Sequence, residues 1–228
     1  MKPERVSFPA QGGAAVLEGR LLDGGGPAVV VSHPHPLHGG DMDHPVVEAV
    51  WRAAGEAGFK SLRYNVHGVG ASTGTLTQQS PLPLDDLAGA MAFLSAGPVR
   101  AIGYSYGART TLQALCANLE LVRAVLIAFP TRLPANRRAM SNLILGRRIS
   151  GEQYKATPDL CLLPRCPRPV RIIAGSLDPL FEAEKIRALG NEPTLVEGVN
   201  HFFSRRLGNQ TPHPDDLAIL AKHTVDFL

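Results

Sequence analysis

The sequence predicts an α/β protein, with a mostly parallel central sheet, helices on both faces of that sheet and an antiparallel hairpin before it. Apolar runs alternate with segments of helical period from residue 27 onward, and such alternation is typical of doubly wound sheets. The runs 28–31 and 123–127 are continuous and rich in β-branched residues, as strands covered on both faces are. Two short extended stretches precede these runs and predict the hairpin.

The elements can be placed one by one along the chain. The hairpin is expected over 6–9 and 14–22, with a glycine-containing turn at 11–13. Later strands are expected at 27–32, 60–66, 99–104, 124–129, 170–174 and 194–196, and helices at 46–57, 85–95, 109–118, 182–189 and 214–227. Sheets of this kind, with right-handed crossovers, bind ligands beyond the carboxyl ends of their strands. Functional residues are therefore expected in the loops that follow the apolar runs.

The composition limits the classes of function. The 228 residues are 44% hydrophobic and 19% charged, which fits a single soluble globular domain over 1–228. No apolar run approaches the roughly 20 residues of a membrane helix, and no apolar signal follows Lys2 and Arg5, so we expect a cytoplasmic protein without a membrane partner. The net charge of +3 is too small to indicate a nucleic-acid partner. A homodimer stays open.

The three cysteines do not predict a disulfide framework. Cys116, Cys161 and Cys166 are odd in number and few, so we expect reduced, partly buried thiols. The C-x4-C spacing of Cys161 and Cys166 leaves a disulfide or a share in a metal site as weaker alternatives.

The segment 131–168 interrupts the regular alternation. It shows no clear strand, and it carries eight Lys and Arg residues against two acidic residues. Its prolines are Pro134, Pro158, Pro164 and Pro167. A long insertion after a central strand favours a small cap or lid over the site. A helical excursion packed on the sheet edge is the other interpretation, and the sequence leaves both open.

The strongest local motif is G-x-S-x-G at 103–107, directly after one apolar run and directly before a helical segment. In this context a serine sits in a strained turn that projects its hydroxyl above the sheet. Glycines are needed two residues before and after it, because a Cβ there would clash with the neighbouring strand and helix. The motif therefore predicts that Ser105 is a nucleophile.

A serine hydroxyl needs a base, and the base needs a carboxylate that orients it. On such folds these residues follow in the order serine, acid, histidine. Asp178 follows the run 170–174, and His201 follows 194–196. We therefore predict Asp178 as the acid and His201 as the base. Alternatives are weaker, because Asp215 and Asp216 come after His201 and open the last helix, His213 lies among prolines and His223 lies within a helical pattern.

Acyl transfer also requires donors for an oxyanion. One donor is expected to be the backbone N–H of Tyr106, the residue after the proposed nucleophile. The second is expected in the loop after the run 27–32, where Pro34 and Pro36 have no N–H to offer. His35, between these prolines, is our candidate.

The same loop raises a second hypothesis. It gathers residue types that bind metals, namely His33, His35, His38, Asp41, Asp43 and His44. A zinc or iron hydrolase could use such a cluster. The complete serine, aspartate and histidine set elsewhere argues against it, so we expect neither a metal nor another cofactor.

With these motifs the sequence resembles the α/β-hydrolase superfamily, and within it the small, nearly lidless bacterial hydrolases related to dienelactone hydrolase and short-chain carboxylesterases. The matching motifs lie at 33–40, 65–74, 103–107, 175–178 and 198–203 and span the chain from about residue 14 to its end. The resemblance implies a serine hydrolase that cleaves a small-molecule carboxylic ester of short acyl chain through an acyl-enzyme. Two alternatives would use the same triad. The first is a thioesterase for acyl-CoA or other thioesters, and the second, less favoured, is a peptidase.

Overall fold

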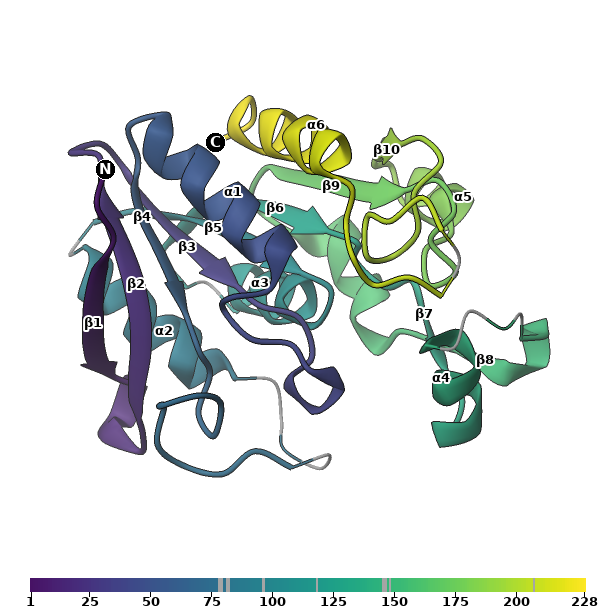
Figure 1. Cartoon of the computed structure of the whole chain (residues 1–228), viewed down its shortest axis with the longest axis horizontal. Coiled ribbons are helices and arrows are strands. Elements are labelled where there is room, and N and C mark those ends of the chain that lie inside the picture. The colour runs from purple at the N-terminus through teal and green to yellow at the C-terminus, as the bar shows by residue number, and fades with distance from the viewer. Residues whose placement is uncertain are drawn as a thin grey trace.

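A computed structural model describes residues 1–77, 80, 83–95, 97–117, 119–144, 147, 149–206 and 208–228. Its central feature is a twisted sheet with helices on both faces (Figure 1). Two predicted positions lie outside the described residues: Asn118, at the end of an expected helix, and Arg148, in the basic segment.

The described part of the chain forms an eight-stranded sheet in the order β1-β2-β4-β3-β5-β6-β9-β10. The strands are β1 (Glu4–Pro9), β2 (Val16–Asp23), β3 (Ala28–Ser32), β4 (Lys60–Tyr64), β5 (Val99–Tyr104), β6 (Leu121–Ile127), β9 (Val170–Gly175) and β10 (Thr194–Val196). The pairs β1–β2 and β2–β4 are antiparallel, and the remaining neighbours are parallel. The predicted mostly parallel sheet with an N-terminal hairpin is confirmed.

Helices cover both faces of this sheet. The α-helices of the described residues are α1 (Pro45–Glu56), α2 (Leu84–Leu94), α3 (Tyr106–Cys116), α4 (Arg137–Ile144), α5 (Ala183–Ala188) and α6 (Pro214–Val225). Helices α1 and α6 lie side by side over one face, while α2 and α3 cover the other (Figure 1). Successive residues of β3 enter the two cores in turn, Val29 with Trp51 on one side and Val30 with Leu112 on the other. Burial on both faces explains the continuous apolar runs.

Helix α3 begins earlier than the sequence predicts, at Tyr106 instead of Arg109. The chain leaves β5 at Tyr104, turns at Ser105 and enters the helix without a connecting loop. The turn residues hide the helical period of the first turn, so the pattern alone places the helix too late.

The segment 131–168 contains β7 (Arg132–Pro134), α4, η3 (Gly151–Gln153), β8 (Tyr154–Ala156) and η4 (Pro158–Arg165). The expectation that it holds no strand is wrong, because β7 and β8 form an antiparallel pair of their own. Figure 1 shows this pair and α4 standing off from the main sheet, whereas η4 packs on α3. The part of the segment in η4 thus packs on a helix, and the cap over the site stays a prediction.

None of the helices in the described ranges combines the length and apolarity that a membrane crossing requires.

Candidate active site

Ser105 occupies the sharp turn between β5 and α3. Its φ of 55° and ψ of −106° cost a non-glycine residue on the order of 1–3 kcal/mol. The two motif glycines permit this turn, because a Cβ on Gly103 would lie 2.4 Å from the Gly107 oxygen, and one on Gly107 would lie 2.3 Å from the Ser32 oxygen. The strand, turn and helix that the motif requires are therefore all present.

His201 and Asp178 reach Ser105 from two later loops. His201 Nε2 lies 2.9 Å from Ser105 Oγ, and His201 Nδ1 lies 2.7 Å from Asp178 Oδ2. Because a carboxylate only accepts, Nδ1 donates to Asp178, and Nε2 is left to accept the Ser105 hydroxyl proton. The Asp178 side chain is completely buried, and the His201 side chain is 9% exposed. The structure brings the three predicted residues together in the geometry of an activated serine.

The acid is fixed by its own loop. Asp178 Oδ1 accepts the Leu180 N–H at 2.8 Å, so both carboxylate oxygens are engaged. The end of β9 also runs directly against the histidine loop, since a Cβ on Gly175 would lie 2.3 Å from the Val199 oxygen. Acid and base are thus held against each other by backbone contact as well as by their hydrogen bond.

Asn200, next to the candidate base, organises the histidine loop. Its Oδ1 accepts the N–H groups of Phe202 at 2.9 Å and Ser204 at 3.2 Å. Its Nδ2 donates to the carbonyls of Arg206 at 2.9 Å and Asn209 at 3.2 Å. The buried amide therefore satisfies four backbone groups of an irregular loop, which fixes the backbone that carries the histidine.

Tyr104 supports the base from the other side. It is buried, and its hydroxyl donates to the His201 carbonyl at 3.0 Å. Neither Tyr104 nor Asn200 is among the site residues predicted from the sequence. Their only sequence signal is their place beside Ser105 and His201, which does not show where their side chains point.

The alternative acids and bases serve elsewhere. Asp216 forms a two-pronged ion pair with Arg205, at 2.8 and 2.9 Å. His213 caps α6, where its Nδ1 accepts the Asp215 N–H at 3.3 Å. His223 lies in the last turn of the same helix. None of them contacts Ser105, so the geometry favours Asp178 and His201.

Two backbone N–H groups are available beside Ser105. Tyr106 is the first residue of α3, where an N–H has no acceptor within the helix. The His35 N–H donates to no acceptor in the described part of the chain, while the His35 carbonyl accepts from His38 and Gly40. Both residues line the same cavity as Ser105. The predicted donors therefore lie near the serine with their N–H groups uncommitted.

The loop histidines do not converge as metal ligands. His33 uses both ring nitrogens internally, donating from Nδ1 to the Pro34 carbonyl at 2.7 Å and accepting the Val66 N–H on Nε2 at 3.2 Å. Among the described residues, no three His, Cys, Asp or Glu side chains are grouped as a metal site. The geometry thus gives no support to the metallohydrolase alternative.

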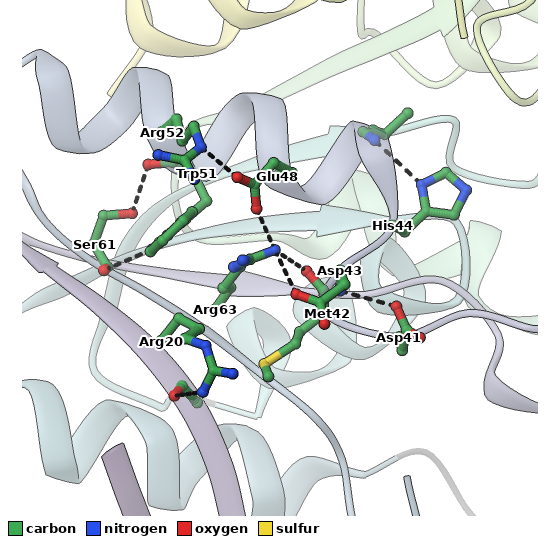
Figure 2. A network of polar contacts seen from close by, with 12 residues as sticks. Arg20, Asp41, Met42, Asp43, His44, Glu48, Trp51, Arg52, Ser61 and Arg63 are labelled. Atoms are coloured by element: carbon green, nitrogen blue, oxygen red, sulfur yellow. Dashed lines mark hydrogen bonds and ion pairs between the residues drawn. The ribbon is translucent and has the colours of Figure 1, made fainter. Parts of the chain in front are cut away.

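A buried arginine ties this loop to α1. Arg63 of β4 donates to the Met42 carbonyl at 2.7 Å and pairs with Asp43 at 3.0 Å and with Glu48 (Figure 2). Its guanidinium also lies 4.3 Å from the centre of the Trp51 ring. Burial lowers the pKa of Arg63, and the two carboxylates counter that effect. One cation therefore fixes the chain just before α1.

The cavity at Ser105 has a volume of about 150 Å³ and two unlike walls. One wall belongs to the loop after β3 and presents His35, His38, Gly39, Gly40 and His44. The other is apolar and presents Pro130, Leu133, Met140, Leu143, Pro179, Leu180 and Phe202. Pockets for drug-sized ligands measure roughly 300–1,000 Å³, so this cavity suits a smaller ligand.

The cation nearest to Ser105 along α3 is neutralised. Arg109 lines the cavity, but it forms an ion pair with the buried Asp159 of η4. Gln113 Nε2 donates to the second Asp159 oxygen at 2.5 Å. The predicted basic segment therefore supplies an acid at this point, and Arg109 is not a free anion receptor.

The cysteines form no disulfide. Cys116, Cys161 and Cys166 are free thiols, and burial beside Cys166 raises the pKa of Cys116 to about 11. A raised pKa disfavours the reactive thiolate. Cys166 is partly buried as expected, whereas Cys161 is exposed.

The sequence was compared with protein-family models and with known proteins. No family model matches the chain. An uncharacterized protein of Rickettsia prowazekii is 26% identical over 193 residues, which cover 78% of this chain and 72% of that protein.

Solved structures resemble the whole chain. A protein of unknown function from Agrobacterium tumefaciens is 23% identical with a TM-score of 0.72, covering 98% of this chain and 94% of its own. A serine hydrolase without lid from Xanthomonas campestris is 24% identical with a TM-score of 0.66, covering 100% and 95%. An esterase from Pyrococcus furiosus is 17% identical with a TM-score of 0.74, covering 100% and 90%. Together with the strand order, these likenesses show that the chain has the α/β-hydrolase fold.

Proposed function

We propose that the protein is a serine hydrolase that cleaves carboxylic esters of short acyl chains through an acyl-enzyme. The observation that carries this proposal is the continuous hydrogen-bonded path from Ser105 Oγ through His201 to Asp178, at 2.9 and 2.7 Å. The names of the structural neighbours, a serine hydrolase and an esterase, agree with it.

The chemistry follows from the proton positions. Ser105 Oγ attacks the ester carbonyl carbon while His201 Nε2 takes its proton, and Asp178 stabilises the resulting imidazolium. The carbonyl oxygen becomes an oxyanion, which the N–H groups of Tyr106 and His35 receive. The bond to the leaving alcohol then breaks, and the alcohol oxygen takes the proton from Nε2.

Deacylation repeats these steps with water. His201 Nε2 takes a proton from water as its oxygen attacks the acyl carbon, and a second oxyanion forms. Its collapse breaks the bond to Ser105 Oγ, which recovers the proton from Nε2, and the carboxylic acid leaves. Every proton passes through one imidazole nitrogen, so no cofactor is needed.

The segment 131–168 is proposed to act as a small cap on the apolar side of the cavity. Its Leu133, Met140 and Leu143 line the cavity together with Ser105, whereas Arg138 of the same helix α4 is exposed. The acyl chain is expected to rest on these side chains. The small cavity volume supports a preference for short chains.

The test is a series of p-nitrophenyl esters from acetate to laurate, run beside acetyl-CoA and butyryl-CoA. We expect the highest kcat/KM for the short oxygen esters and loss of turnover in Ser105→Ala. A preference for acyl-CoA would replace the esterase with the thioesterase alternative. Equal turnover by the wild type and Ser105→Ala would exclude the serine mechanism.

A further inference from the structure

Two histidines beside the site have a defined tautomer. His44 Nδ1 accepts the Val46 N–H at 3.2 Å, and His35 Nδ1 accepts the Leu37 N–H at 3.2 Å. A neutral imidazole carries a single proton. Because Nδ1 is an acceptor in both rings, that proton resides on Nε2, and each ring has one N–H donor left to offer.

Both rings are uncharged at neutral pH. Burial lowers the pKa of His35 and of His44 from 6.5 to about 4. For His44 the nearby Asp41 partly opposes this shift, while His201 and His33 add to it. Each ring is therefore a neutral donor, suited to an oxygen acceptor rather than to charge neutralisation.

His44 is the better placed of the two. Its ring lines the cavity that contains Ser105 and lies 5.1 Å from the Tyr104 ring, centre to centre. In the described part of the chain, its Nε2–H meets no protein acceptor. The His35 ring instead packs between His38 and Tyr106, each at 4.7 Å. His44 is partly buried beside the cavity, so an oxygen atom of a molecule bound there can accept its N–H.

The direction of this donor is fixed by its surroundings. Figure 2 shows His44 at the start of α1, with its Nδ1 turned toward the helix and its Nε2 turned away from it. The preceding residues Met42 and Asp43 are both held by Arg63. The donor is thus supported by a rigid helix start and a buried ion pair, as preorganised recognition requires.

We propose that His44 Nε2–H donates a hydrogen bond to a substrate oxygen other than the scissile carbonyl. The substrate class is then an ester that carries a further ether, hydroxyl or carbonyl oxygen close to the scissile bond. This inference rests on the proposed ester hydrolysis and adds a specificity-determining residue to it. The scissile oxygen itself belongs to the N–H groups of Tyr106 and His35.

The test compares isosteric esters that differ by one oxygen. On the acyl side these are p-nitrophenyl methoxyacetate and p-nitrophenyl butyrate. On the alcohol side they are methoxyethyl butyrate and butyl butyrate. The quantity measured is the ratio of kcat/KM within each pair, relative to the same ratio in a variant, so that the intrinsic reactivity of each ester cancels.

Two variants separate the two nitrogens of the ring. His44→Ser keeps a good helix cap but removes the donor, so the preference for the oxygen-bearing ester should fall about threefold to tenfold in one pair. His44→Gln keeps an amide N–H near the place of Nε2 but loses the cap. It should retain the preference while its Tm falls below that of the wild type and of His44→Ser.

The outcomes are distinct. A preference lost in His44→Ser and kept in His44→Gln supports the proposal. An unchanged ratio in His44→Ser for both pairs would overturn it, because the ring would then not contribute to the preference. An equal loss in both variants would also overturn it, because the ring would then act by its shape and not by its N–H. If the wild type cleaves none of these esters, the proposed function has failed, and the inference about His44 falls with it.

Discussion

The two walls of the cavity around Ser105 are built on different principles. In the wall formed by the loop after β3, which we call the histidine wall, ring nitrogens of His35 and His44 bond to backbone groups, and Arg63 ties the chain to α1. The opposite wall combines Leu133, Met140 and Leu143 of the segment 131–168 with four residues from outside it, and β7 and β8 of this segment pair with each other and stand off from the main sheet (Figure 1). Its cavity lining is apolar side chains alone.

The two walls have different tasks: one side of the site holds the reacting groups, and the other accommodates the acyl group. Hydrogen bonds to the backbone are directional, so the histidine wall and the loops of Asp178 and His201 hold reacting groups in one geometry. Apolar contacts are not directional, so the cap side can tolerate changes in the shape of an acyl group. Substitutions on the first side should therefore affect turnover, and substitutions on the second should affect substrate choice.

The largest effect is expected from Asp178→Asn. Asparagine keeps the size of the side chain but removes the charge that stabilises the imidazolium and its tautomer, so kcat should fall on the order of 10⁴-fold. Ester hydrolysis under saturating substrate measures this change. Asp216→Asn is the matched control, because Asp216 pairs with Arg205 rather than with His201, and its kcat should stay close to that of the wild type.

Asn200→Ala should have the next largest effect. It leaves two N–H groups and two carbonyls of the histidine loop without their partner, which costs on the order of 1–3 kcal/mol of stability. A displaced base should lower kcat by roughly tenfold to a hundredfold. Asn209→Ala, in which the main-chain carbonyl remains to accept from Asn200, should show neither change. Full activity in Asn200→Ala would mean that the histidine is positioned without it.

Asp178 could be predicted from the sequence, whereas the role of Asn200 could not. The strands, the elbow at Ser105 and the order of Asp178 and His201 follow from local patterns, because a parallel sheet brings the carboxyl ends of its strands to one edge. The role of Asn200 depends on where an irregular loop folds back on itself, which has no periodic signal. The Arg63 network likewise joins residues that are adjacent only in the folded chain.

Buried His33 should make stability depend on pH. Burial lowers its pKa from 6.5 to about 4. Between these two pH values His33 is therefore protonated in the unfolded chain and neutral in the folded chain. Stability is therefore fully present above pH 6.5 and declines as the pH falls toward 4. Between about pH 7 and pH 5, protonation of His33 in the unfolded chain should lower the free energy of unfolding by about 2 kcal/mol.

Urea unfolding at the two pH values measures this decline. His33→Gln keeps a donor and an acceptor without a titrating ring, so its stability should fall less than that of the wild type over the same range. His213, exposed at the start of α6, provides the control, because His213→Gln should reproduce the wild-type slope. Equal slopes in His33→Gln and the wild type would contradict the burial account.

The smallest effect is expected on the cap side. Met140→Ala together with Leu143→Ala enlarges the apolar wall, so longer acyl chains should gain roughly threefold to tenfold in kcat/KM relative to acetate. Turnover of acetate should hardly change. Arg138→Ala alters the exposed side of the same helix and should leave the preference as it is. An unchanged chain-length profile in the double variant would place the acyl group elsewhere.

The short strands β7 and β8 show why this wall is hard to foresee. Each spans three residues, too few for an alternating pattern to be recognised. The ion pair of Arg109 with Asp159 joins residues 50 positions apart, so the charge count of the segment did not reveal that the cavity cation is neutralised. Composition indicated an insertion, but not which of its side chains face Ser105.

The central claim is that Ser105 is the nucleophile, and covalent labelling tests it most directly. The protein is incubated with a fluorophosphonate probe, digested and mapped by peptide mass spectrometry, with Ser105→Ala treated in parallel. Activation by His201 and Asp178 predicts one phosphonyl adduct, on Ser105, and no adduct in the variant. An unlabelled wild type, or equal labelling of Ser105→Ala at another residue, would contradict the account.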